Sequence, residues 1–231
     1  MKYPGSLYGR LAYQDLTTTD VYRLKLTGNL NTDDWEVINT MTNLYELDLS
    51  KIEVDTLTQI KSRLPFLSSI KFPQVLKYVD DGAFSNSLLQ QDTLIIPASC
   101  RLIGQSAFGH TNVRHVEING STIIKEYAFG YCKRLRTFNA KGENIVLENK
   151  AFQSSALQKV DMGSRGVIRN DAFYYCDSLE EIVFQDGVDS IYENAFQAIP
   201  LKKITMNGCI KHIGENAFIA SKSKISCIIS T

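Results

Sequence analysis

Residues 179–196 read LEEIVFQDGVDSIYENAF, and residues 201–218 repeat the pattern as LKKITMNGCIKHIGENAF. Both segments contain an apolar-x-apolar stretch, then an apolar residue four positions before an Ala, and both end on an Ala-Phe pair. A segment that returns at a fixed step of this length is typical of a repeat protein. The repeat therefore decides the fold class before any single element is assigned.

Seven Ala-Phe pairs mark the repeat along the chain, at steps of 24, 21, 23, 21, 23 and 22 residues. Their phenylalanines are Phe84, Phe108, Phe129, Phe152, Phe173, Phe196 and Phe218. The apolar residues four positions before each Ala are Val79, Ile103, Ile124, Leu147, Ile168, Ile191 and Ile213. We expect the Ala where the backbone turns tightly, and each Phe inside the molecule against the Phe of the neighbouring coils.

The apolar-x-apolar stretches form a ladder that alternates as a half-buried strand does. Its rungs begin at Leu24, Leu47, Ile70, Leu94, Val116, Phe138, Val160, Ile182 and Ile204, with a tenth at Ile228/Ser230. This predicts a mainly β solenoid with short helical or 3-10 corners, in about ten coils of 22–24 residues. At about 4.8 Å per coil the stack is roughly 45–50 Å long.

The first coils lack the Ala-Phe pair and carry helical signals instead. A helix is predicted from Asn31 or Thr32 to Met41, with Trp35 and Ile38 on its buried face. A second helix is predicted after Asp55 and before Pro65, and its buried residues are Leu57, Ile60 and Leu64. We therefore expect one domain over 1–231, with an N-terminal cap and helix-containing coils in 1–72 and Ala-Phe coils in 73–231.

The composition excludes several function classes. The 231 residues carry 25 Lys plus Arg and 25 Asp plus Glu, so the formal net charge is zero, which argues against a nucleic-acid partner. No run of apolar residues is long enough to span a membrane, and no nucleotide, metal-ligand or catalytic motif occurs. We therefore expect no enzyme activity, no cofactor and no metal site.

The five cysteines are expected to lie in the core as free thiols, because their number is odd and no CxxC pair occurs. Cys132 and Cys176 occupy the same rung two coils apart, about 9–10 Å by strand spacing. A disulfide needs Cα atoms within about 7 Å of each other. Both cysteines are therefore predicted to be unpaired.

The repeat resembles the BspA-like, or treponemal-type, leucine-rich repeat of surface proteins from gut and oral anaerobic bacteria. The motifs that carry the resemblance are the two quoted segments, the Cys three residues after Phe at Cys132 and Cys176, and the N-terminal segment around Leu44 and Leu49. The resemblance implies a right-handed leucine-rich-repeat stack. It also likens the closing residues 226–229 to the start of a longer C-terminal segment, so we expect the C-terminus to be truncated.

The resemblance implies a non-enzymatic cell-surface or secreted module, with its export signal removed or not included, that mediates protein–protein interaction or adhesion. Its partner would be a protein of the host extracellular matrix or of another microbe's surface. A glycan is the alternative ligand, and self-association through the uncapped C-terminal coil is a further expectation. The competing hypothesis is a structural spacer within a larger surface protein, with no binding role of its own.

Candidate binding residues are those that flank the buried strand positions and so point outward on the concave side. They are His115, Glu117, Asn139, Lys159, Asp161, Glu181 and Lys203. Tyr131, Tyr174 and Tyr175, next to the Ala-Phe corners, are added because Tyr is a frequent anchor at interfaces. Two alternatives stay open: the strand positions form a merely solvated face, and the corner tyrosines lay their rings over neighbouring coils for stability.

Overall fold

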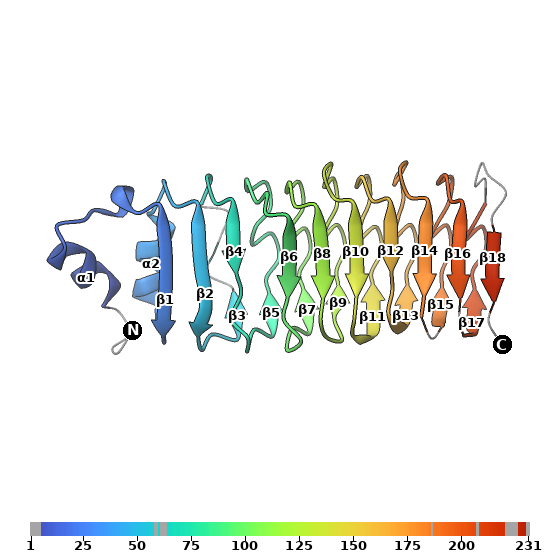
Figure 1. The fold of residues 1–231 in the computed structure, drawn as a ribbon, viewed down its shortest axis with the longest axis horizontal. Helices are drawn as coiled ribbons and strands as arrows, with labels where there is room; N and C mark the ends of the chain where they lie inside the picture. The colour runs from blue at the N-terminus through green and yellow to red at the C-terminus, as the bar shows by residue number, and fades with distance from the viewer. Residues whose placement is uncertain are drawn as a thin grey trace.

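The computed structural model describes residues 6–57, 60, 64–185, 187–206 and 208–219, and the backbone of 226–229. Short parallel strands stack in sequence order along one long axis, so the chain forms a mainly β solenoid (Figure 1). The predicted fold class is thereby confirmed. Each coil passes along one face, turns, and returns along a second face.

One face, the long-strand face, carries the apolar-x-apolar ladder. Its strands in the described residues are β1 (Arg23–Gly28), β2 (Glu46–Ile52), β4 (Ser69–Lys71), β6 (Thr93–Ile96), β8 (His115–Ile118), β10 (Thr137–Ala140), β12 (Lys159–Asp161), β14 (Glu181–Phe184), β16 (Lys203–Met206) and β18 (Ser226–Ile229). The parallel register places Leu94, Val116, Phe138 and Val160 in one column. The ladder read from the sequence is therefore a buried stripe of the folded chain.

The second face carries the residues that precede each Ala by four positions. Its strands are β3 (Thr56–Leu57), β5 (Tyr78–Val79), β7 (Leu102–Ile103), β9 (Ile123–Ile124), β11 (Glu143–Leu147), β13 (Ser164–Ile168), β15 (Val188–Ile191) and β17 (Ile210–Ile213). They form one continuous parallel sheet from β3 to β17. Val79, Ile103 and Ile124 are direct neighbours in its register, as the spacing predicted.

The number of coils and the last rung differ from the prediction. Eight coils of the described chain carry strands on both faces, because α2 replaces the second strand after β1 and none is described after β18. The register of β18 pairs Ile204 with Cys227 and Thr205 with Ile228. The rung predicted at Ile228/Ser230 is therefore wrong by one residue, because this step is 23 residues rather than 24.

The N-terminal cap contains the predicted helix α2 (Thr32–Asn39). Asn31 caps it, because its side-chain oxygen accepts from the N–H of Asp34 at 3.0 Å, and Trp35 is buried as expected. Helix α1 (Leu7–Tyr13) and a 3-10 turn at Thr18–Asp20 precede it and were not predicted. The buried Asp34 carboxylate accepts from the N–H of Leu7 at 3.0 Å and so joins the two helices.

The start of the second predicted helix is wrong. Residues 56–57 form strand β3, because Leu57 pairs with Val79 of β5 and extends the second face. Residues 58–59 and 61–63 of the predicted helix lie outside the described residues. Leu57, Ile60 and Leu64 are buried, as predicted.

The Ala-Phe corners form a third hydrogen-bonded side of the coil. The N–H of each Phe from Phe84 to Phe196 donates to the carbonyl of the next coil's Ala, at 2.7–3.2 Å. The residues two before and two after Phe adopt left-handed backbone, as at Tyr127 (φ 55°) and Tyr131 (φ 59°). The Ala is therefore found where the backbone turns tightly, as predicted.

The phenylalanine rings of the seven corners stack face to face through the interior. Neighbouring centroids are 5.0–5.4 Å apart and the ring planes differ by 5–12°. Phe72 and Phe138 of the long-strand face pack edge-on against this stack. Phe66, which belongs to no ladder, is 54% exposed. The phenylalanine stack is therefore the centre of the core.

Cys100, Cys132 and Cys176 are free and buried, as predicted, but the prediction of a core position is wrong for Cys209, which is exposed. Cys132 and Cys176 belong to a column of hydroxyl and thiol side chains three residues after the Phe of the first five corners, which also contains Ser87, Thr111 and Ser155. The Cys132 sulfur lies 3.5 Å from the Thr111 hydroxyl, and the Cys176 sulfur 3.3 Å from that of Ser155. Ser155 thus lies in the coil between the two cysteines. Ser87, Thr111 and Ser155 replace the motif's Cys in three coils, and the apolar Ile199 replaces it after Phe196.

The stack makes a prediction about stability. Phe152→Ala removes a buried ring that stacks at 5.4 Å on both Phe129 and Phe173, and should lower the free energy of unfolding by about 3–5 kcal/mol. Urea unfolding measures the loss. Phe66→Ala, at the exposed phenylalanine, is the control and should cost less than about 0.5 kcal/mol. Equal losses for the two variants would contradict the stack as the centre of the core.

The thiols make a second prediction. Burial raises the pKa of Cys132 to about 11 and that of Cys176 to about 12, so both stay protonated at pH 8 and should resist a thiol reagent. In a Cys227→Ser variant, titration of the native protein should detect one thiol, the exposed Cys209, and four after unfolding. Rapid native labelling of Cys132 or Cys176 would contradict the buried column.

Candidate functional site

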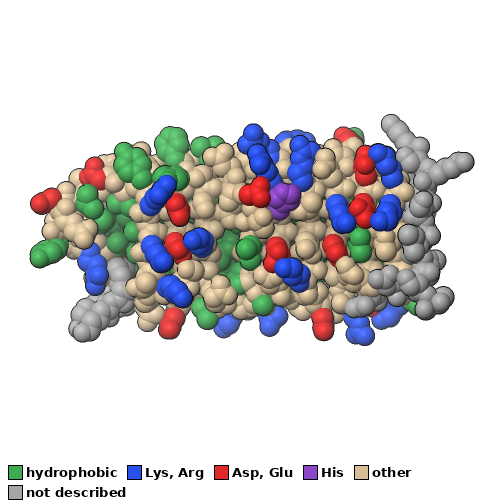
Figure 2. All heavy atoms as spheres, in the orientation of Figure 1, with side chains coloured by type: hydrophobic (Ala, Val, Ile, Leu, Met, Phe, Trp, Pro, Cys, Tyr) green, Lys and Arg blue, Asp and Glu red, His purple; other side chains and the backbone are tan. Residues whose placement is uncertain are grey.

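The outward side chains of the long-strand face form ion pairs between neighbouring coils. The Glu181 carboxylate lies between two lysines, 3.3 Å from Lys159 Nζ and 3.0 Å from Lys203 Nζ. Figure 2 shows acidic and basic side chains side by side on this face. The hydrogen bond from Lys203, and then that from Lys159, holds the pKa of Glu181 below its ordinary value. Three of the predicted binding residues thus satisfy one another's charge.

A similar pairing occurs near the N-terminal end of the face. Lys71 Nζ lies 3.5 Å from the Asp48 carboxylate, which also accepts from the Ser50 hydroxyl at 2.6 Å. Burial opposes the charge of Asp48, but these donors outweigh it and lower its pKa. Arg23 pairs with Glu46 at 3.4 Å. The balanced composition therefore reflects charges matched across neighbouring coils.

The remaining predicted strand residues also have partners or share the same rows. Lys141 pairs with Glu117 at 2.6 Å, Gln185 donates to Asp161 at 2.8 Å, and a hydrogen bond of 2.7 Å joins His115 to the Thr137 hydroxyl. The half-buried Asn139 lies between Glu117 and Asp161 in the register. The structure thus brings the predicted residues together in two rows along the face.

The tyrosine corners divide into a packed and an exposed group. The Tyr131 ring stacks on His110 with the ring centroids 4.8 Å apart, and its centroid lies 6.3 Å from that of Tyr127. The Tyr131 hydroxyl accepts a hydrogen bond of 2.9 Å from the Gln153 side chain. Tyr131 therefore lies over its neighbouring coils, as the stability alternative proposed. The ring centroids of Tyr174 and Tyr175 lie 4.1 Å apart, and Tyr175 is 57% exposed.

The long-strand face is interrupted between β4 and β6. Strands β1, β2 and β4 form one sheet, and β6 to β18 form another, whereas β5 and β7 of the second face remain paired (Figure 1). Across the interruption, the Gln91 side chain accepts from the N–H of Ile70 at 2.7 Å and donates to the carbonyl of Thr93 at 3.0 Å. One side-chain amide thus takes the place of strand-to-strand pairing.

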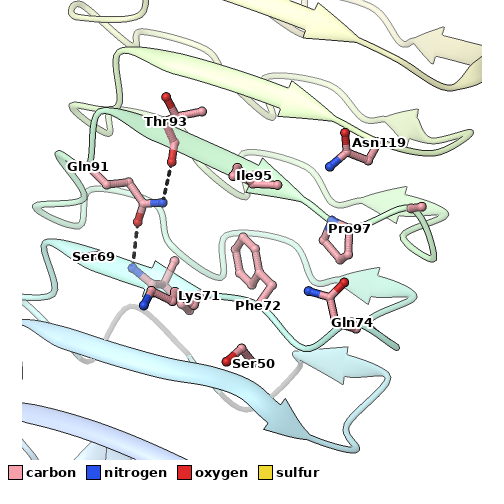
Figure 3. Close-up of a pocket in the computed structure, with 12 residues that line it drawn as sticks. Ser50, Ser69, Lys71, Phe72, Gln74, Gln91, Thr93, Ile95, Pro97 and Asn119 are labelled. Atoms are coloured by element: carbon pink, nitrogen blue, oxygen red, sulfur yellow. Dashed lines mark hydrogen bonds between the residues drawn. The ribbon is translucent and has the colours of Figure 1, made fainter.

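A cleft of about 480 Å³ opens at this interruption (Figure 3). Phe72, which directly follows β4 and is 5% exposed, lines one side of it, and Ile95 of β6, which is 53% exposed, lines the other. Polar side chains surround them, and these are Ser50, Ser69, Lys71, Gln74, Gln91, Thr93 and Asn119. The cleft therefore combines accessible apolar surface with many hydrogen-bonding groups.

Sequence reasoning missed this cleft, although two signals were present. The step from Ile70 to Leu94 is 24 residues, whereas the next five steps are 22. Ile95 is also an apolar residue at an outward position, between the polar residues Lys71 and Glu117 of the neighbouring coils. The two added residues break the pairing, and Ile95 is left at the edge of the opening.

The repeated coil of this chain is shared with a known protein family. The family model described as the BspA type leucine rich repeat region matches in six copies, over residues 61–167 and 149–231. The chain belongs to this family. The match covers the Ala-Phe coils, both rows of outward residues and the residues that line the cleft except Ser50.

Two solved structures are similar to this BspA-type chain. A leucine-rich cell surface protein from Faecalibacterium prausnitzii has 18% identity and a TM-score of 0.45, with 92% of this chain and 74% of that chain covered. A leucine-rich repeat protein from Bacteroides ovatus has 17% identity and a TM-score of 0.36, with 88% and 65% covered. A search of curated proteins finds no match.

Neither a membrane-spanning helix nor a metal-binding cluster occurs among the described residues. In the part of the chain that the structure describes, no helix is long and apolar enough to cross a membrane. The same described residues contain no cluster of three or more His, Cys, Asp or Glu side chains placed to hold a metal ion.

The paired charges predict the titration of Glu181. Its carboxyl should titrate below the ordinary value of a glutamate, and Lys203→Met should raise the midpoint, because Lys203 is its strongest partner. Lys202→Met is the matched control, since Lys202 pairs with Glu180 at 2.6 Å. Carboxyl NMR measures both midpoints. The stabilisation is complete above the unfolded-state pKa and is lost as the pH falls through the lowered folded-state pKa.

Proposed function

We propose that this chain is a non-enzymatic module of a cell-surface or secreted bacterial protein, and that it mediates adhesion by binding a protein of the host matrix or of another microbe. The observation that carries the proposal is the exposed Ile95 beside the cleft on the long-strand face. An accessible apolar residue surrounded by polar side chains is the usual anatomy of a protein interface.

The docking surface extends from the cleft along the two rows of outward residues. One row runs from Ile95 through Glu117 and Asn139 to Asp161. The other row runs from Thr93 through His115 to Lys159, Glu181 and Lys203. The charges in these rows are already paired within the chain, so they contribute more to orientation and specificity than to affinity. Tyr174 and Tyr175 provide a second, smaller contact at the corners.

The family and the core support a binding role rather than catalysis. The residues that define the repeat are buried and stack on one another, and the buried thiols of Cys132 and Cys176 have raised pKa values, which is the opposite of an activated nucleophile. No cofactor enters the proposal. A protein partner is favoured over a glycan because the exposed groups at the cleft include the aliphatic Ile95 and main-chain strand edges.

Binding to an array of purified matrix proteins, bacterial surface proteins and glycans tests the proposal. For any protein that binds, Ile95→Asp should weaken binding about tenfold or more, because it places a charge at the centre of the interface. Ile123→Asp is the matched control, since Ile123 is 42% exposed on the second face, and it should leave binding within about twofold.

Other outcomes separate the alternatives. Charge reversal at Lys159, Asp161, Glu181 or Lys203 could abolish binding while Ile95→Asp binds as the wild type does. That result would place the contact at the end of the rows away from the cleft. Binding that survives every one of these variants would contradict the long-strand face as the docking surface. An array without any bound protein would favour the structural spacer.

A further inference from the structure

The two strands that border the cleft turn unpaired edges toward each other. On β4, the N–H of Ser69 donates to the carbonyl of Tyr45 at 3.0 Å, toward β2. Because the main-chain groups of successive strand residues point to opposite sides, those of Ile70 point into the cleft. The bond from Ile70 to the Gln91 side chain agrees with this direction.

The opposite edge belongs to β6. The carbonyls of Asp92 and Ile96 accept from the N–H groups of His115 and Asn119, at 2.9 and 3.1 Å, toward β8. The same alternation turns the main-chain groups of Thr93 and Ile95 into the cleft. Among the described residues, the N–H and carbonyl of Ile95 and the carbonyl of Ile70 have no hydrogen-bond partner across the interruption.

Gln91 shows what kind of group this space accepts. Its carboxamide has the same donor and acceptor as a peptide group, and it accepts from Ile70 and donates to Thr93 (Figure 3). A strand between β4 and β6 would present a peptide group with the same two bonds. The Gln91 side chain therefore imitates one peptide unit of an absent strand. Beside it, the N–H of Gln90 donates to the carbonyl of Ser68 at 3.0 Å and closes that end of the opening, whereas the main-chain groups of Ile95 and the carbonyl of Ile70 stay unpaired within the described chain.

We propose that the cleft binds an extended segment of the protein partner, which displaces the Gln91 side chain and hydrogen-bonds through its main chain to β4 and β6. This inference rests on the proposed function and names its mechanism, which is strand addition. The partner segment is a peptide with alternating side chains. Those that face inward are small and apolar against Phe72, and those that face outward contact Ile95 and the Lys71 stem.

The fold allows this addition without loss of the stack. On the second face β5 stays paired with β7, and the Phe84 and Phe108 rings stay stacked at 5.2 Å. The opening is therefore confined to one face. Its volume of about 480 Å³ lies within the usual range of ligand pockets, which is about 300–1,000 Å³.

An NMR titration of the full chain tests the mechanism. The probe is an end-blocked peptide Thr-Val-Thr-Val-Thr. The control is the same peptide with both valine nitrogens methylated. The unmodified peptide should shift the amide resonances of Ile70, Thr93 and Ile95 and slow the hydrogen exchange of Ile95. The methylated peptide should bind at least tenfold more weakly, because one of its two edges has lost its N–H donors and carries methyl groups that keep a neighbouring strand away.

Substitution of Gln91, whose side chain occupies part of the cleft, is the second part of the experiment. Gln91→Ala frees the Ile70 N–H and the Thr93 carbonyl, so it should bind the unmodified peptide about tenfold more tightly than the wild type. Gln90→Ala, at the exposed neighbouring glutamine, should bind as the wild type does. The two peptides compared on the wild-type chain decide the question even if Gln91→Ala fails to fold.

Three results would overturn strand addition: equal binding of both peptides, resonance shifts away from the cleft, or no resonance shift with the wild type or Gln91→Ala. A partner protein that Ile95→Asp repels but that the unmodified peptide does not displace would also overturn it, while the proposed function stands. Peptide binding at the cleft with no partner on the array would support strand addition and count against adhesion to the arrayed proteins.

Discussion

The hydrogen bond from the N–H of each corner Phe, from Phe84 to Phe196, to the next coil's Ala carbonyl sets the spacing on which the rest of the structure depends. These bonds of 2.7–3.2 Å hold the corners in register, and the same spacing places neighbouring Phe rings 5.0–5.4 Å apart in the interior. Corner and core therefore cannot shift independently. Any change in the length of a coil has to be absorbed elsewhere, on one of the strand faces.

The cleft between β4 and β6 is where this happens. The coil that spans it is two residues longer than the next five coils, yet Phe84 and Phe108 remain stacked and β5 remains paired with β7. The added length thus separates only the long strands, and Gln91 fills part of the opening. A constraint that keeps the core regular thereby leaves one irregular and accessible place on the surface.

The same regular spacing explains the neutral surface. Side chains at equivalent positions of adjacent coils lie one strand spacing apart, so acids and bases that alternate along the chain meet as pairs such as Glu181 with Lys203 and Asp48 with Lys71. Exposed pairs of this kind contribute little to stability, about 0–1 kcal/mol each. They instead cancel the charge of the long-strand face, and apolar contact at Ile95 becomes its most distinctive feature.

The sequence by itself determined the coil, its ladders, the buried Phe stack, the free thiols and helix α2, because each follows from the spacing of residues along the chain. The tertiary structure decided the rest, because it depends on which segments meet. Thr56 and Leu57 form a strand because Val79 and its neighbour lie alongside, and helix α1 is held by Asp34, 27 residues away. The cleft likewise exists only because the fixed corners force two added residues out of register on a single face.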